Sequence, residues 1–80
     1  MAEKHKLMKR GLIVEKRQEL EALEIKIDRC VKDLEYYAFP FDGVESIETD
    51  KVLQAAQELT GLCERWKSVS RDVSRLEGEV

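Results

Sequence analysis

The chain has 80 residues, of which 39% are charged and 6% aromatic, and its formal net charge is −3. This length holds one domain with a modest core, which excludes a multidomain protein. The near balance of charge gives no overall attraction to nucleic acid or to a membrane surface. The composition is typical of long amphipathic helices rather than of a sheet.

The chain shows no segment for export or for crossing a membrane. The only apolar run near the N-terminus is Leu12-Ile13-Val14, which is far shorter than the apolar part of a signal peptide. No stretch approaches the roughly 20 apolar residues of a membrane-spanning helix. With two cysteines and no export signal, we expect a cytoplasmic protein with reduced thiols that does not enter a membrane.

The first half of the chain predicts a helix over about residues 3–37, because apolar residues recur at three- and four-residue spacing. The stripe consists of Ile13, Leu20, Leu23, Ile27, Cys30, Leu34 and Tyr37, broadened by Val31. No proline interrupts it. Lysines take the stripe positions near the N-terminus, so we expect the first ten or so residues to fray most easily.

Residues from about 38 to 47 are expected to connect this helix to a second one. Pro40 disfavours a helical conformation for the residue before it, and Asp42-Gly43 is a turn signal. Ser46, Thr49 and Asp50 are each suitable as the N-cap of the second helix. The sequence leaves the choice among these three caps open.

The second half contains a heptad repeat, which predicts a helix over about residues 48–77 that ends at Gly78. The a positions are Val52, Leu59, Trp66, Val73 and Val80. The d positions are Ala55, Leu62, Val69 and Leu76. Every a and d position is therefore apolar, as expected for a helix that packs lengthwise on another helix.

We therefore predict an all-α protein, a coiled-coil-like antiparallel hairpin of two helices in one domain over residues 1–80. Folding about the loop brings residues whose numbers sum to about 89 to the same height. Leu23 then lies near Trp66, and Trp66 is expected to be buried. Because two helices make a thin core, we expect the hairpin to dimerise into a four-helix bundle. The alternative is two separate helices that pair between chains.

The two cysteines are expected to be small core residues. In the hairpin register Cys30 and Cys63 differ in height by about four residues, or roughly 6 Å. This offset argues against a disulfide between them.

Apolar residues outside the two stripes form a first candidate surface for a partner. They are Leu7, Val14 and Ile25 on a second side of the first helix, and Leu53 beside the stripe of the second. The plainer interpretation is a set of scattered surface hydrophobes, which are normal on soluble proteins.

The connection is a second candidate surface, because it holds four of the five aromatic residues: Tyr36, Tyr37, Phe39 and Phe41. These side chains either fold inward and cap the core, or form an exposed docking knob with an acidic rim, since aromatic residues are enriched among interface anchors. We expect a mixed arrangement, with both tyrosines inward and Phe41 exposed.

The N-terminal segment is a third candidate surface, since it holds six basic residues: Lys4, Lys6, Lys9, Arg10, Lys16 and Arg17. Residues 36–50 are acidic, and a hairpin places the two segments at opposite ends. This polarity predicts an antiparallel dimer or a site for phosphate. A solvated charged surface is the plainer interpretation, and the lack of interleaved aromatic or glycine residues makes the nucleic-acid signal weak.

No catalytic, metal-binding or cofactor-binding motif is present, and His5 has no cysteine pair near it. We therefore predict a non-enzymatic module for helical interaction or assembly, such as a small adaptor or chaperone-like subunit. Its expected partner is a second copy of itself or another helical protein. The alternative is a small nucleic-acid-binding regulator that uses the basic N-terminal end.

Overall fold

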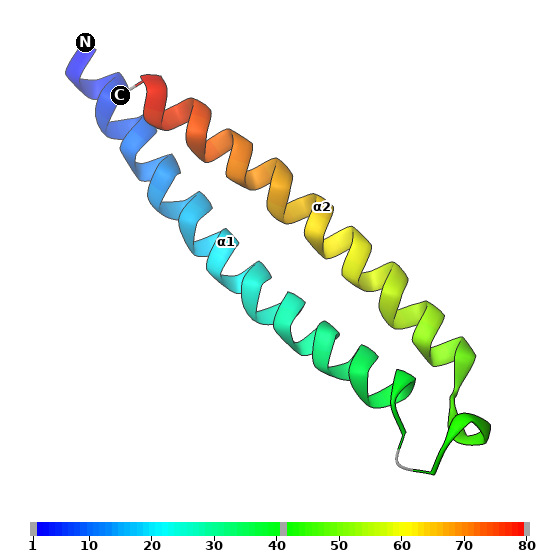
Figure 1. Ribbon diagram of the computed structural model, residues 1–80. Coiled ribbons are helices and arrows are strands. Elements are labelled where there is room, and N and C mark those ends of the chain that lie inside the picture. Colours follow the sequence, from blue (N-terminus) through cyan, green and yellow to red (C-terminus); the bar gives the residue numbers. More distant parts are fainter. Residues whose placement is uncertain (1, 41, 80) are drawn as a thin grey trace.

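The protein is a hairpin of two long helices. The structure is a computed structural model that describes residues 2–40 and 42–79, with side chains for 7–40 and 42–79. Helix α1 (Ala2–Ala38) and helix α2 (Thr49–Glu79) lie antiparallel, joined through a single 3-10 turn, η1 (Val44–Ser46) (Figure 1). The rod measures 65 × 14 × 14 Å. Of the described residues, 92% are helical and none is in a strand. The predicted all-α hairpin is thus confirmed.

The helix boundaries agree with the predicted ones to within two residues, but both ends of α2 form differently from expectation. The residue before α2 is Glu48, which is none of the three predicted caps, and its carbonyl accepts the Val52 N–H at 3.0 Å. Ser46 is used in η1 instead. Gly78 does not end α2, which continues to Glu79. A glycine ends a helix where it takes positive φ, and among the described residues only Gly43 does so.

The connection turns at Gly43, as the Asp42-Gly43 signal predicted. Gly43 has φ of 91°, a conformation that glycine adopts without steric cost. Its carbonyl accepts the Ser46 N–H at 3.1 Å. This bond closes η1, a turn that sequence reasoning did not predict.

The core is the predicted seam. All of its buried residues belong to the two stripes: Ile13, Leu23 and Cys30 from α1, and Ala55, Val69, Val73 and Leu76 from α2. Val69 is the most buried, with 1% of its surface exposed. Cross-helix contacts confirm the predicted register, because Lys16 pairs with Asp72 and Trp66 with Glu24. Both cysteines are free thiols.

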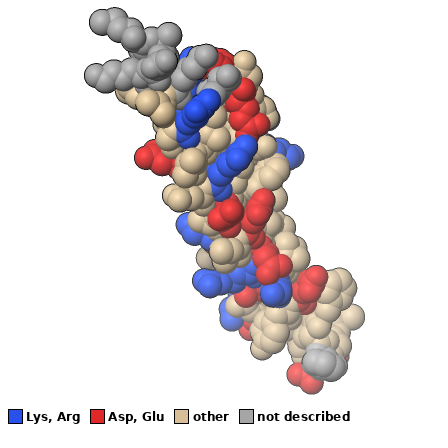
Figure 2. Space-filling model, turned by 90° about the vertical axis from the view of Figure 1, so that its left-hand side faces the viewer, with Lys and Arg blue, Asp and Glu red and all other residues tan. Residues whose placement is uncertain are grey.

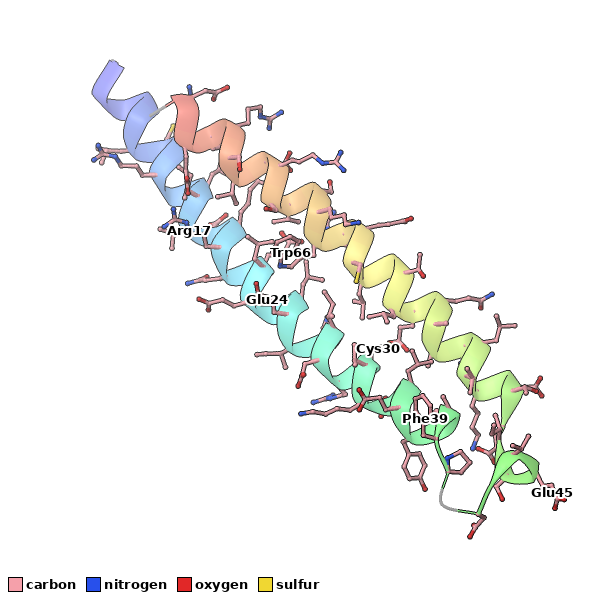
Figure 3. All side chains as sticks on the ribbon, in the orientation of Figure 1. Arg17, Glu24, Cys30, Phe39, Glu45 and Trp66 are labelled. Carbon is pink, nitrogen blue, oxygen red and sulfur yellow. The ribbon has the colours of Figure 1, made fainter. Side chains whose placement is uncertain are left out.

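Trp66 lies at the edge of the seam, so the expectation that it is buried is wrong. It is only half-buried, and its indole N–H donates to a carboxylate oxygen of Glu24 at 3.1 Å (Figure 3). A buried indole N–H needs an acceptor, and the acceptors lie at the rim of an apolar seam. The indole therefore leans outward toward Glu24.

Gly61 offers a simple test of α2. It is exposed within the helix, and a Cβ at this position would meet no atom within 4 Å. Gly61→Ala is therefore expected to raise the free energy of unfolding by about 0.5–1 kcal/mol, because alanine loses less backbone entropy in a helix. Urea denaturation followed by circular dichroism measures the change. Gly43→Ala should do the reverse, since its φ is 91°. A loss of stability in Gly61→Ala would mean that this surface is covered.

Candidate protein-binding surfaces

The end of the rod that carries the connection, here called the tip (residues 35–48), exposes large apolar side chains. Tyr36 is 76% exposed, Phe39 78% and Val44 82%. The expectation that both tyrosines point inward is wrong for Tyr36, whereas Tyr37 is half-buried. Adjacent residues of a helix point about 100° apart, so only one of the two tyrosines can lie on the seam. Phe41 lies outside the described residues.

Tyr37 fixes the aromatic surface of the tip to the hairpin. Its ring meets that of Tyr36 edge to face, with centroids 5.4 Å apart and planes at 73°, a favourable geometry for aromatic pairs. On α2, Lys51 Nζ lies 5.3 Å from the centroid of the Tyr37 ring, within the range of a cation–π contact. Tyr37 thus contacts both the exposed Tyr36 and the second helix.

An open groove of about 650 Å³ lies between these aromatics and the connection. Its apolar lining comes from Tyr36, Tyr37, Phe39 and Pro40, and its polar lining from Lys32, Glu35, Asp42, Ser46 and Glu48. A groove with an apolar floor and polar edges suits an amphipathic ligand.

Acidic groups dominate the charge around this groove. Lys32, the lysine that lines the groove, pairs with Asp28 at 2.9 Å, and Lys51, nearby on α2, pairs with the groove residue Glu48 at 3.0 Å. Hydrogen bonds to these carboxylates raise the pKa of both lysines. Within the described part of the chain, the remaining acids form no ion pair: Glu35, Asp42 and Glu45. Figure 3 shows Phe39 and Glu45 at this end of the rod.

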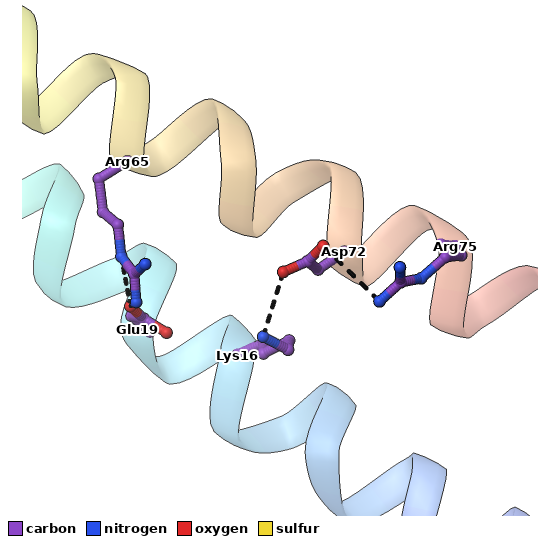
Figure 4. Close-up of polar contacts among 5 residues, drawn as sticks. All are labelled: Lys16, Glu19, Arg65, Asp72 and Arg75. Atoms are coloured by element: carbon purple, nitrogen blue, oxygen red, sulfur yellow. Dashed lines mark hydrogen bonds and ion pairs between the residues drawn. The ribbon is translucent and has the colours of Figure 1, made fainter.

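At the opposite end, α2 neutralises much of the predicted basic surface. Lys9 pairs with Glu79 at 3.3 Å. Lys16 pairs with Asp72 at 3.3 Å, next to Arg75 (Figure 4). Arg17 pairs with Glu77, and Arg10 is exposed; the side chains of Lys4 and Lys6 are not among those described. Figure 2 shows basic and acidic side chains intermixed along the visible face. The described side chains therefore do not form a concentrated basic patch.

The four apolar residues outside the stripes are all exposed but do not form one surface. Leu7, Val14, Ile25 and Leu53 have 65%, 56%, 66% and 60% of their surfaces exposed. Leu7 lies near the chain ends and Leu53 near the tip. Leu7 lies beside exposed Met8, and Leu53 adjoins a further apolar surface, described next.

The two flanks of the seam differ, and sequence reasoning missed this. The same heptad applies to α1, with Ile27 and Leu34 at a positions and Leu23 and Cys30 at d positions. Near the tip, the g positions on one flank carry only exposed charges: Lys26, Asp33, Lys51 and Glu58. On the other flank the a and e positions carry half-buried apolar residues, here called the open flank: Ile27, Val31, Leu34, Ala38, Val52, Ala56, Leu59 and Cys63. Apolar and small residues at the e positions were the signal available in the sequence.

Ion pairs and hydrogen bonds close the rest of the seam. On the charged flank, Arg65 donates to Glu19 at 2.6 Å and 3.0 Å (Figure 4). On the flank that is open near the tip, the bond from Trp66 to Glu24 and the pair of Arg17 with Glu77 cover the half near the chain ends. The open flank is thus confined to the half of the rod near the tip.

The described side chains contain no group of three His, Cys, Asp or Glu residues placed to hold a metal ion. The predicted absence of a metal site at His5 lies outside the described side chains. Neither helix, over its described residues, is long and apolar enough to cross a membrane. No protein-family model, curated protein or solved structure matches this chain.

Proposed function

We propose that this protein is a non-enzymatic helical interaction module that binds another helical protein through its tip. The observation that carries the proposal is the apolar groove with an acidic rim at the end of a 65 Å rod. Apart from the edge-to-face contact of Tyr36 with Tyr37, the exposed surfaces of Tyr36 and Phe39 contribute no apolar burial to the hairpin. Large exposed aromatics of this kind are enriched among the residues that anchor protein interfaces.

The chemistry of the groove indicates a basic amphipathic helix as its ligand. Apolar side chains of such a helix fit against Tyr36 and Phe39, and its lysines or arginines complement Glu35, Asp42 and Glu45. The tip is small compared with a standard interface of about 800 Å² per partner. Binding at this site alone is therefore weak and depends on salt.

The nucleic-acid alternative receives less support. Three of the six basic residues that would contact phosphate pair with carboxylates of α2: Lys9, Lys16 and Arg17. Binding to phosphate would break those pairs. Retention on heparin at low salt is the result that would favour nucleic-acid binding.

The free thiols suit the reducing cytoplasm proposed for this protein.

The tip is tested with a fluorescent basic amphipathic peptide of leucine and lysine, and with a matched peptide in which glutamate replaces lysine. We expect the basic peptide to bind the protein and the double variant Tyr36→Ser/Phe39→Ser to bind it at least about tenfold more weakly, the loss typical of interface anchors. Fluorescence anisotropy measures both affinities. Helicity and melting should change little, because both side chains are exposed.

The matched control is Val14→Ser/Ile25→Ser, which removes two exposed apolar residues far from the tip. It should bind the basic peptide as the unmodified protein does. Equal binding by the tip variant, or equal binding of the acidic peptide, would mean that the groove is not the docking site.

A further inference from the structure

Because it is a rod of 65 × 14 × 14 Å, the hairpin exposes more surface than a compact protein of its size. The chain exposes 6556 Å², whereas a compact monomer of 9.3 kDa exposes about 5,000 Å². The excess of roughly 1,500 Å² is larger than the approximately 800 Å² that each partner contributes to a standard interface. The rod therefore has enough exposed surface for a partner to bind along it without disturbing the seam.

The pattern of the open flank fits a four-helix bundle. Helices that face the core of a bundle are apolar at the a and d positions and at e or g. In this hairpin the a and d positions form the seam, and the e positions near the tip are small or apolar: Val31, Ala38, Ala56 and Cys63. A second hairpin placed on this flank would bury these side chains.

The charges that border the open flank determine how two copies can pair. The border on α1 is acidic: Glu21, Asp28, which pairs with Lys32, and Glu35. The corresponding positions on α2 carry no acid: Leu53 and Thr60 beside the open flank, and Lys67 and Ser74 beyond it toward the chain ends. Antiparallel copies would place α1 against α1 and oppose two acidic borders, which is unfavourable. Parallel copies place the acidic border against α2.

In the parallel pairing, Glu21 of one copy lies at the height of Lys67 in the other, the same register that joins Lys16 to Asp72 within a hairpin. Both Glu21 and Lys67 are exposed. The antiparallel dimer predicted from the polarity of the sequence also loses its attraction. Lys9, Lys16 and Arg17 are already paired with α2, so among the described basic side chains of that segment only Arg10 is left to meet an acidic tip.

We propose that the open flank binds a second copy of this chain side by side, with both tips at the same end and α1 of each copy against α2 of the other. The result is a four-helix bundle that presents two tip grooves together. This interface adjoins the tip, since Glu35 and Ala38 lie at the boundary of the two surfaces, but it does not involve Tyr36 or Phe39 and does not depend on what the tip binds.

The interface is tested by sedimentation equilibrium of the whole protein and of Ala56→Glu. We expect a dimer, and at least an approximately 30-fold weaker association in the variant, because the substitution buries an unpaired charge in each copy. The matched control is Gln54→Glu, which adds a carboxylate on the exposed side of the same turn and should leave association unchanged. Circular dichroism verifies that both variants fold. A monomeric protein at several hundred micromolar, or equal association of both variants, overturns the proposal.

The orientation is tested first by reversing charge at exposed positions, where folding is not at risk. Lys67→Glu should weaken association about three- to tenfold, since it places like charges at two rim contacts of the dimer, and adding Glu21→Lys should restore it. No loss in Lys67→Glu would contradict the pairing of α1 with α2 between copies.

Spin-label distances test the orientation independently. Val44→Cys at the tip and Ser74→Cys near the chain ends are labelled one at a time in a Cys30→Ala/Cys63→Ala background. Parallel copies place both label pairs within about 30 Å, two to three helix diameters. The two sites are roughly 40 Å apart along the rod at 1.5 Å per residue, so antiparallel copies make at least one distance exceed about 40 Å. Such a distance overturns the proposed orientation.

The two interfaces can fail separately. Tyr36→Ser/Phe39→Ser should leave self-association unchanged, and Ala56→Glu should leave binding of the basic peptide per chain unchanged. A tip variant that dissociates the dimer would show that the tip, and not the open flank, joins the copies.

Discussion

Val69→Asp is expected to unfold the hairpin at neutral pH. Val69 has 1% of its surface exposed, and a carboxylate there has no water and no partner on the apolar seam. We expect a loss of about 3–5 kcal/mol, in the upper range for single substitutions. A two-helix core of this size provides no more than that. Circular dichroism should show a large loss of helicity at 25 °C.

The matched variant is Ile25→Asp, which introduces the same residue on the outward side of α1. Ile25 is 66% exposed, so this change should stay within roughly 0.5 kcal/mol, as for most surface substitutions. Similar melting of the two variants would show that the stability of the hairpin does not come from the seam.

The seam and its register were predictable because the heptad repeat and the loop length determine them together. A strict apolar repeat of seven allows one face of α2 to pack lengthwise. A loop of about ten residues then leaves α1 a single antiparallel register. The cross-helix pairs Lys16–Asp72 and Trp66–Glu24 lie in that register.

The surfaces were harder to predict, because they depend on how the chain returns along itself. The basic N-terminal segment reads as polarised in sequence, yet α2 brings Asp72, Glu77 and Glu79 against it. Tyr36 and Tyr37 read as one aromatic cluster, but one helical step separates an exposed ring from a half-buried one. Residue types within a stripe do not show which flank of the seam stays open, since that depends on pairs of e positions from both helices.

Sequence reasoning assigned both cysteines to the core, and the structure separates them. Cys30 is 4% exposed and its thiol donates to the Ala55 carbonyl at 3.2 Å. Burial, with the nearby carboxylates of Glu58 and Asp33, raises the pKa of this thiol above its ordinary value of 9.0. Cys63 is half-buried on the open flank. Since the thiolate is the reactive form, the two positions should react very differently.

We expect iodoacetamide to alkylate Cys30 at least about 100-fold more slowly than Cys63 at pH 8, with the protein diluted until it is monomeric. Modification of Cys30 requires the hairpin to open, so its rate follows the small open fraction, whereas Cys63 is partly accessible in the closed hairpin. Peptide mass spectrometry measures both rates. In urea the two rates should converge, which controls for intrinsic reactivity. Equal rates without denaturant would show that the seam near the tip does not stay closed.

The raised pKa of Cys30 also sets the direction of a pH effect. A thiol whose pKa is higher in the folded protein binds its proton more tightly there, and this tighter binding stabilises the fold. The stabilisation is complete below the pKa of the thiol in the unfolded chain. It is lost as the pH rises through the pKa of the thiol in the folded protein. The melting temperature should therefore fall above pH 9 or so, and the fall should be smaller in Cys30→Ala. Cys63→Ala is the control and should keep the full fall, because this substitution leaves Cys30 unchanged in the seam. If the melting temperature falls equally in the unmodified protein, Cys30→Ala and Cys63→Ala, groups other than Cys30 cause the fall.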